Sequence, residues 1–151
     1  MSIALALALL AAREPIGVFA NWGAFREPAR CYAIALPARR ARSGAPAFAD
    51  VASWPRRGVR SQFHARLSRT RSPRARVTLS VGERSFRLVA GAADAWGADP
   101  ASDRAIVAAM RAARSMSIES VDDRGRPFAD TYALRGAATA IDAAALACAG
   151  A

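Results

Sequence analysis

The single histidine of the chain, His64, is the residue type most often used for acid–base chemistry near neutral pH. It stands in the segment 62–68, where apolar and polar residues alternate, and it shares the polar side of that alternation with Arg66. A catalytic triad would also need an activated nucleophile, and the chain contains no Gly-x-Ser-x-Gly sequence. We therefore expect His64 to be a solvated surface residue, and we expect no catalytic residues and no enzyme activity.

Two groups of aspartates have a composition that could bind a cation. Asp122 and Asp123 precede Arg124-Gly125, and this pattern is typical of a hairpin turn whose carboxylates accept hydrogen bonds from their own backbone. The second group surrounds a predicted helix start without the spacing of an EF-hand loop and consists of Asp94, Asp99 and Asp103. Asp99 before Pro100 is typical of a helix N-cap. We expect no metal site, and the absence of a glycine-rich phosphate loop predicts no bound cofactor.

The basic charge is concentrated in the middle of the chain. The formal net charge is +10, and all 22 basic residues are arginine; eleven of them and a single acid, Asp50, fall between Arg39 and Arg76. Such a surface would attract polyanions, although GC-rich codons also produce an arginine-only composition, so both explanations stay open. The arginines expected to form an anion-binding surface stand in a turn and on outward strand faces: Arg56, Arg57, Arg66, Arg74 and Arg76.

The two cysteines, Cys31 and Cys148, are separated by most of the chain. No Cys-x-x-Cys or Cys/His group accompanies them, which argues against a zinc site or a thioredoxin-like centre. An isolated pair suits a structural disulfide in an oxidising compartment; two buried free thiols are the alternative. We expect a Cys31–Cys148 disulfide that attaches the end of the chain to the first part of the domain.

The first twelve residues, MSIALALALLAA, form an apolar run that ends at Arg13. The run is shorter than the roughly 20 residues that cross a bilayer, and it resembles the apolar part of a secretory signal. It has no basic start, and Leu10 stands where cleavage after Ala12 prefers a small residue. We interpret residues 1–12 as a signal peptide, truncated at its start, and residues 13–151 as one β-rich globular domain that is periplasmic or secreted. The alternative is a packed first element of a cytoplasmic protein.

Strands dominate the predicted elements, at 17–25, 31–36, 47–54, 62–68, 74–81, 85–90, 116–121 and 128–134. The segments 74–81 and 85–90 alternate around Gly82-Glu83 and predict a hairpin. The side chains expected to share one core face are Phe63, Leu67, Val77, Leu79, Phe86 and Leu88. The fold class is therefore mainly β with two short helices, either an antiparallel β-sandwich or a partly closed sheet with α additions.

Both predicted helices lie in the second half of the chain. The first begins at Asp99-Pro100, and Arg111 and Arg114 at its end suit the helix dipole. The second follows Gly136 and is built of small apolar residues. Helical spacing predicts a packing face of Leu134, Ala138, Ile141, Ala145 and Cys148.

The end of the chain resembles the C-terminal signature of the invasion-associated locus B family, in which a strand with a Ser-Leu-Lys-Gly type motif runs into a small-residue helix. Here the corresponding residues are DTYALRGAATAID at 130–142. Upstream features occur in matching order: Trp22, Cys31, the strands around Gly82, and AIVAAM at 105–110 before a Met-Ser-Ile strand. The resemblance implies an exported, β-rich, disulfide-bonded protein without an established enzymatic activity. Family members usually carry more cysteines, including one where 25–27 reads Phe-Arg-Glu here.

These observations favour an exported, non-catalytic structural or interaction domain of the cell envelope. Its partner would be an envelope or host component, with anionic polymers or lipid headgroups as candidate ligands. Nucleic acid is disfavoured because an exported protein meets envelope polyanions first. The alternative is a basic polyanion- or nucleic-acid-binding module, and a hydrolase with an unrecognised residue set is a third hypothesis.

Overall fold

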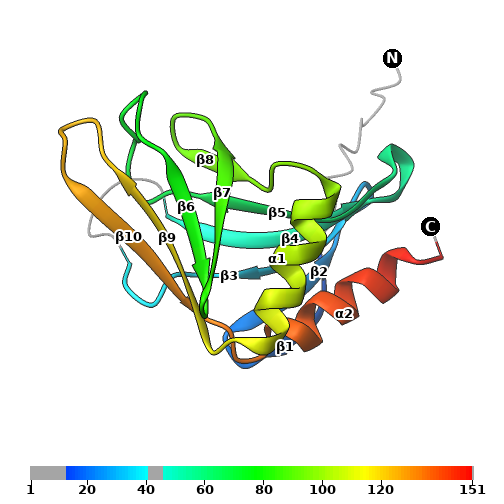
Figure 1. Cartoon of the computed structure of the whole chain (residues 1–151). Helices are drawn as coiled ribbons and strands as arrows, with labels where there is room; N and C mark the ends of the chain where they lie inside the picture. Colours follow the sequence, from blue (N-terminus) through cyan, green and yellow to red (C-terminus); the bar gives the residue numbers. More distant parts are fainter. Residues whose placement is uncertain (1–12, 41–45, 151) are drawn as a thin grey trace, which may run out of the picture.

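The computed structural model describes residues 13–40 and 46–150 (Figure 1). The expected signal segment, 1–12, lies outside the described residues, as do residues 41–45 of the arginine-rich stretch that begins at Arg39. None of the helices in the described part of the chain is long and apolar enough to cross a membrane.

Ten antiparallel strands form one sheet in the order β1-β2-β3-β4-β5-β8-β7-β6-β9-β10. The strands are β1 (Glu14–Phe19), β2 (Trp22–Arg26), β3 (Cys31–Ala35), β4 (Phe48–Trp54), β5 (Val59–Arg66), β6 (Val77–Val81), β7 (Arg84–Ala90), β8 (Asp94–Trp96), β9 (Ser115–Val121) and β10 (Pro127–Ala133). A single 3-10 turn, η1 (Pro55–Arg57), and two helices, α1 (Pro100–Ala112) and α2 (Ala137–Cys148), complete the described fold. The mainly β class is confirmed, as one open sheet rather than a sandwich of two.

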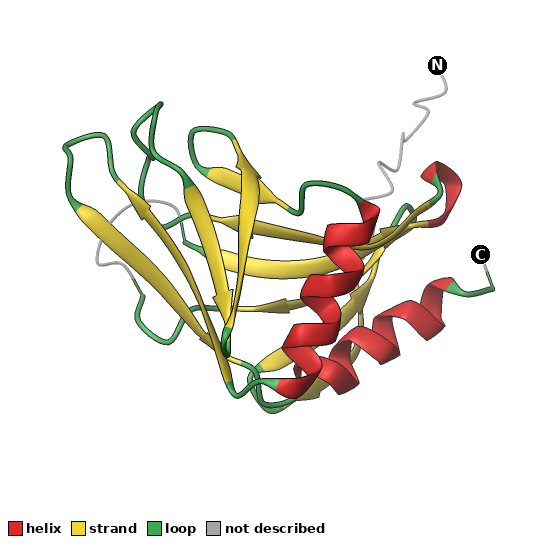
Figure 2. Cartoon of the chain, viewed as in Figure 1, coloured by secondary structure: helices red, strands yellow, loops and turns green. Residues whose placement is uncertain are grey.

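Small side chains on the inner face allow the sheet to curl. Strand pairing aligns a row of alanines across five strands: Ala35, Ala49, Ala65, Ala95 and Ala90. Methyl groups leave room for the other half of the sheet to approach, and larger side chains from that half fill the core. Figures 1 and 2 show the result, with β6, β9 and β10 in front of β3, β4 and β5 and both helices at one end.

The predicted core face is confirmed. Five of its six side chains belong to the buried core cluster, and Phe86, partly buried, packs against it. The hairpin of β6 and β7 that presents several of them is also confirmed, with Leu79 opposite Phe86 and Val77 opposite Leu88.

The expected first strand, 17–25, is wrong: the structure has a tight hairpin there. β1 ends at Phe19 and β2 begins at Trp22, and Ala20 between them adopts a positive φ of 51°. The turn reverses the chain, so Val18 is 76% exposed while Trp22 is fully buried. The Trp22 indole N–H donates to the Ala133 carbonyl at 2.9 Å, which ties this hairpin to β10. Other strand boundaries also differ from the prediction: β5 begins at Val59 and ends at Arg66 rather than spanning 62–68, and β6 begins at Val77 rather than at residue 74. The short β8 was not predicted.

The first helix begins as predicted. The Asp99 carboxylate accepts a hydrogen bond from the Ser102 backbone N–H at 2.6 Å, and Pro100 occupies the first helical position. The packing face predicted for the second helix is confirmed in part. Leu134 and Ile141 are buried and Cys148 packs against the core. The other buried residues of the helix are Ala137, Ala140 and Ala144, whereas Ala145 is exposed. The alanines of the predicted face are displaced by one position because neighbouring alanines give no contrast between adjacent faces.

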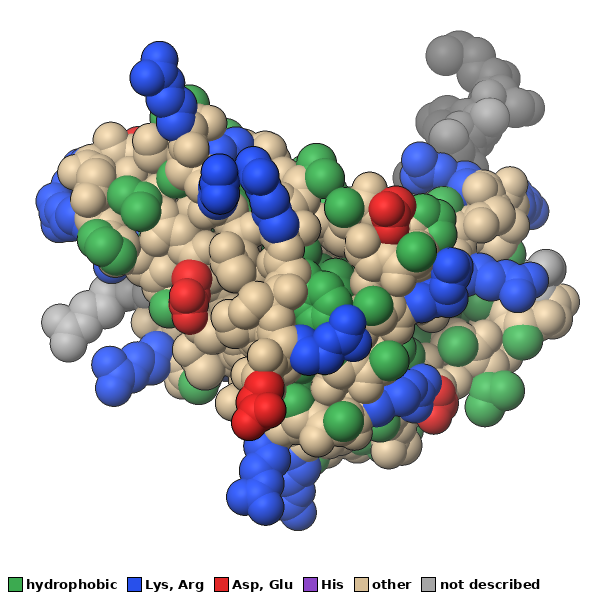
Figure 3. All heavy atoms as spheres, in the orientation of Figure 1, with side chains coloured by type: hydrophobic (Ala, Val, Ile, Leu, Met, Phe, Trp, Pro, Cys, Tyr) green, Lys and Arg blue, Asp and Glu red, His purple; other side chains and the backbone are tan. Residues whose placement is uncertain are grey.

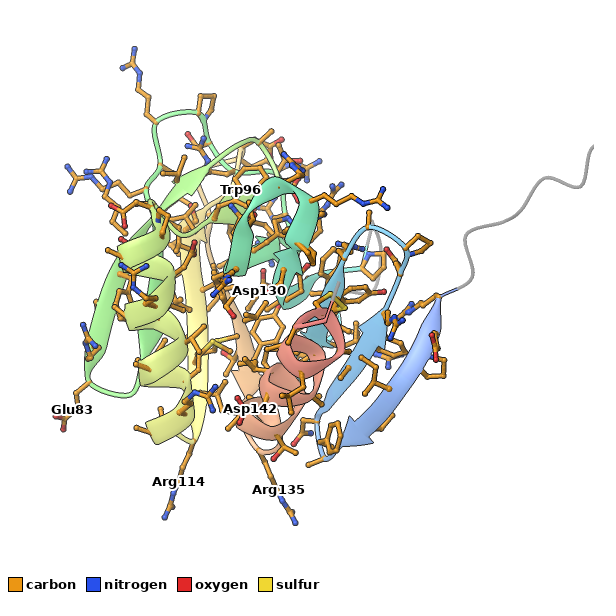
Figure 4. The ribbon with its side chains drawn as sticks, turned by 90° about the vertical axis from the view of Figure 1, so that its right-hand side faces the viewer. Glu83, Trp96, Arg114, Asp130, Arg135 and Asp142 are labelled. Atoms are coloured by element: carbon orange, nitrogen blue, oxygen red, sulfur yellow. A yellow bond between two sulfur atoms is a disulfide. The ribbon has the colours of Figure 1, made fainter. Side chains whose placement is uncertain are left out.

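The predicted disulfide is confirmed. Cys31 at the start of β3 and Cys148 at the end of α2 are bonded, with their Cα atoms 5.9 Å apart. Figure 4 shows the bond in yellow beside α2. Disulfides of this structural kind are typical of proteins outside the reducing cytoplasm.

Candidate ligand-binding face

Strand register builds an unusual outer face over β2 to β5 and β8. The residues next to the alanines in each strand point to the opposite, outer face of the sheet. One outward row across the strands consists of Ile34, Asp50, His64 and Trp96. A neighbouring row holds Phe48, Arg66 and Asp94. Antiparallel sheets usually present polar residues to water on their outer side. This face instead combines aromatic rings with paired charges, which makes it the candidate site of the molecule.

His64 lies between two carboxylates from neighbouring strands. Its Nδ1 is 3.0 Å from Asp50 Oδ2, and its Nε2 is 2.9 Å from Asp94 Oδ1. Asp94 also accepts a hydrogen bond from the Arg66 guanidinium at 3.3 Å. The Trp96 ring stacks on the imidazole with ring centres 5.4 Å apart. The prediction of a solvated surface histidine is therefore wrong: the side chain is 18% exposed and fully engaged.

Two carboxylate partners favour the doubly protonated imidazole, because both ring nitrogens must then donate. Partial burial, the largest single influence, opposes this charge, but hydrogen bonds and charges from Asp50 and then Asp94 together raise the pKa of His64 above its ordinary value. With both nitrogens occupied, His64 has no free position from which to take a proton from a nucleophile. The geometry therefore favours a charged imidazole that joins β4, β5 and β8.

We expect the stability of the protein to fall as the pH rises through the pKa of folded His64. A group whose pKa is raised by folding contributes stability fully below its unfolded pKa of about 6.5, and the contribution is lost above the folded pKa. Urea unfolding between pH 6 and pH 9 should show this decline. His64→Gln should flatten it, since His64 is the only histidine. An NMR titration of the imidazole that gave a midpoint below 6.5 would contradict the assignment.

Beside this cluster, arginines and aromatic rings contact one another in a row that we call the arginine–aromatic ladder: Arg13, Phe25, Tyr32, Arg30, Trp54 and Arg57. The guanidinium carbon of Arg13 lies 3.8 Å from the Phe25 ring centre, and that of Arg30 lies 4.3 Å from Tyr32. The remaining contacts span 5.7 to 5.9 Å, within the range of cation–π attraction.

Glu27 fixes the middle of the ladder. Its carboxylate accepts hydrogen bonds from the Arg30 guanidinium at 2.9 Å and from the Tyr32 hydroxyl at 3.0 Å. The Arg30 hydrogen bond, the largest influence, and the Tyr32 bond lower the pKa of Glu27 against the opposing effect of burial. Arg13 and Arg57 are exposed and belong to none of the ion pairs formed by the described residues. A guanidinium stacked on a ring keeps its in-plane N–H donors free for an anion.

The five arginines predicted to bind anions do not converge. Arg56 and Arg57 lie in η1, before β5, whereas Arg66 ends that strand, so roughly 20 Å of strand separates them. Arg66 is paired with Asp94. Of the set, the structure brings only Arg57 into the ladder. On the face seen in Figure 3, arginine side chains project at several separate places rather than in one patch.

Arg74 and Arg76 precede β6 and line a hollow of about 300 Å³ together with Arg87 of β7. Arg87 was not among the arginines predicted to bind anions. We call these three residues the Arg76 cluster. The neighbouring Arg71 has a structural role, because its guanidinium donates to five backbone carbonyls around this loop. The Arg76 cluster thus forms a second basic surface, without the interleaved aromatic rings of the ladder.

Two of the remaining aspartates, Asp122 and Asp103, serve local structure. Asp122 Oδ1 accepts from the backbone N–H groups of Arg124 and Arg126 at 3.0 and 2.9 Å, as predicted for a turn residue. Asp103 is buried and accepts from the Phe63 backbone N–H at 3.1 Å, an anchor of α1 to β5 that was not predicted. No group of three or more His, Cys, Asp or Glu in residues 13–40 and 46–150 is arranged to hold a metal ion.

Comparison of the chain with protein-family models, with curated proteins and with solved structures finds no match.

Proposed function

We propose that this chain is an exported, non-catalytic binding domain that recognises an anionic polymer or lipid headgroup of the cell envelope. The observation that carries the proposal is the arginine–aromatic ladder. Stacking on rings holds the guanidinium groups in place before a ligand arrives, so less side-chain entropy is lost on binding. Its two end members, Arg13 and Arg57, have donors left for an anion.

Export to the periplasm or the medium forms part of the proposal, as does a place for the chain as a divergent member of the invasion-associated locus B family. The disulfide and the apolar run at 1–12 support export. The mainly β fold and the residues around 130–142 support the family placement. The intact mass of native protein, measured with and without reductant, tests the export proposal. We expect cleavage near Arg13 and a gain of two hydrogens on reduction; full-length protein found in the cytosol would contradict export.

The binding experiment compares two double variants with the same loss of charge. Arg13→Ser/Arg57→Ser removes the ends of the ladder, and Arg74→Ser/Arg76→Ser removes part of the Arg76 cluster. We expect the ladder variant to lose at least about tenfold in affinity for heparin and lipopolysaccharide at low salt, since hydrogen bonds to charged groups contribute roughly 1.5–3 kcal/mol each. The second variant should change affinity little.

Binding should also weaken steeply between low and physiological salt, because counterions are released from the polyanion. Equal losses in both double variants would show that net charge alone drives binding. A loss confined to Arg74→Ser/Arg76→Ser would place the site on the outer face of β6 and β7. A preference for duplex DNA that survives physiological salt would favour the nucleic-acid-binding alternative.

A further inference from the structure

An apolar groove of about 690 Å³ adjoins the ladder on the outer face of β1 to β4. It shares Arg13 and Phe25 with the ladder, and its lining also includes Val18, Trp22, Ile34, Leu36 and Phe48. The volume falls within the range of small-molecule sites in proteins. The groove therefore has room for a ligand that also reaches the ladder.

The lining is unusual in its exposure and its charge. Val18 is 76% exposed and Leu36 is 48% exposed, so aliphatic side chains stand open to water on this face. The only charged residues among the described lining are Arg13 and Arg40, and no carboxylate belongs to it. Glu27, the acid that contacts the ladder, is held by Arg30 and Tyr32. The groove thus offers apolar contact along its length and positive charge at its rim.

Resting on the proposed function, we propose that the groove holds the acyl chain of a single-chain anionic amphiphile whose headgroup binds the ladder arginines. The ladder alone would accept any anion, and an apolar groove alone would accept any aliphatic chain. Their junction at Arg13 and Phe25 selects a molecule that carries both parts. The guanidinium of Arg13, 3.8 Å above the Phe25 ring, stands where the chain would meet the headgroup.

Alkyl phosphates below their micelle concentrations provide the probes, titrated by calorimetry into the protein purified with its disulfide intact. Each methylene removed from water strengthens binding up to roughly fourfold. We therefore expect dodecyl phosphate to bind at least about tenfold more tightly than octyl phosphate, and butyl phosphate to bind weakest. Dodecyl maltoside, which has the same chain and no charge, should bind more weakly than dodecyl phosphate.

Two groups of variants separate the chain site from the headgroup site. Val18→Asn/Leu36→Asn should weaken dodecyl phosphate binding at least about tenfold and leave butyl phosphate binding unchanged. Val89→Asn, which alters an aliphatic side chain that is 55% exposed on β7, serves as the matched control and should change neither. Arg13→Ser/Arg57→Ser should weaken both ligands, because it removes headgroup contacts.

Affinity that does not depend on chain length, or wild-type affinity in Val18→Asn/Leu36→Asn, would overturn the groove proposal while the headgroup proposal stands. Binding only above the micelle concentration, or only to anionic vesicles, would also overturn it, because the partner would then be a membrane surface. Dodecyl phosphate binding that Arg13→Ser/Arg57→Ser leaves unchanged would instead contradict the role of the ladder.

Discussion

Reduction of the Cys31–Cys148 disulfide is expected to lower the free energy of unfolding by about 2–5 kcal/mol. The bond joins residues 117 positions apart, so it restricts nearly the whole unfolded chain. It also holds the end of α2, where packing is poor: the buried residues of that helix stop at Ala144, and Leu146 is 75% exposed. Because domains of this size are stable by only about 5–15 kcal/mol, a large part of the stability depends on this bond.

Urea unfolding of the wild type with and without reductant measures the effect. The matched control is Cys31→Ala/Cys148→Ala, which should resemble the reduced wild type and should not respond to reductant. Alanine is preferred to serine because Cys31 is 1% exposed, and a hydroxyl there would be buried without a known partner. A wild type whose midpoint does not move on reduction would contradict the expected contribution.

Much of the sheet could be predicted from alternation of apolar and polar residues, because the strands around Phe63, Leu79 and Phe86 bury one face only. The first hairpin could not. Its turn at Ala20-Asn21 lacks glycine and proline, and a single asparagine is a weak local signal for a reversal of the chain. Contacts with the distant end of the chain accompany the positive φ of Ala20: Trp22 bonds the end of β10, and Asn21 bonds the β10–α2 connection.

The His64 cluster could not be predicted from the turn between β4 and β5 alone. Trp54 pairs with Val59 beside that turn, and the same register continued along the strands would place Asp50 opposite Phe63. A register shift between Ala52 and Trp54 instead brings Asp50 opposite His64, and Asp94 lies in a strand that alternation did not reveal. The arginine–aromatic ladder could not be predicted from the sequence. Its contacts join η1 and three strands, and they depend on side-chain directions that strand register alone does not determine.

The arginines also differ between their predicted and their observed surroundings. Arg57 and Arg66 are nine positions apart and stand on a turn and a strand as predicted, yet one stacks toward Trp54 and the other pairs with Asp94. Charge counted along the sequence does not distinguish an arginine with a carboxylate partner from one that faces solvent. Only the exposed, unpaired members can serve an anionic ligand, and these come from parts of the chain that are distant in sequence.

Replacement of Gly136 by alanine is expected to lower the free energy of unfolding by about 2–5 kcal/mol. Gly136 joins β10 to α2 with a φ of 89°, a conformation that costs other residues about 1–2 kcal/mol. An added Cβ would also overlap the carbonyl oxygen of Phe19, which is backbone and cannot rotate away. Relieving that overlap should add roughly 1–3 kcal/mol, in the range of overpacked cores.

Gly125→Ala is the matched control for this substitution. Gly125 has a φ of 78°, but an added Cβ would meet nothing within 4 Å, so the variant carries the backbone cost alone. Equal losses of unfolding free energy in the two variants would show that the Phe19 carbonyl does not crowd the new Cβ at Gly136.

If the Phe19 carbonyl does crowd that Cβ, the turn after β1 should be displaced. The hydrogen bond from the Asn21 N–H to the Arg135 carbonyl should then break. Because Asn21 also lines the apolar groove, Gly136→Ala should then weaken dodecyl phosphate binding, and Gly125→Ala should not.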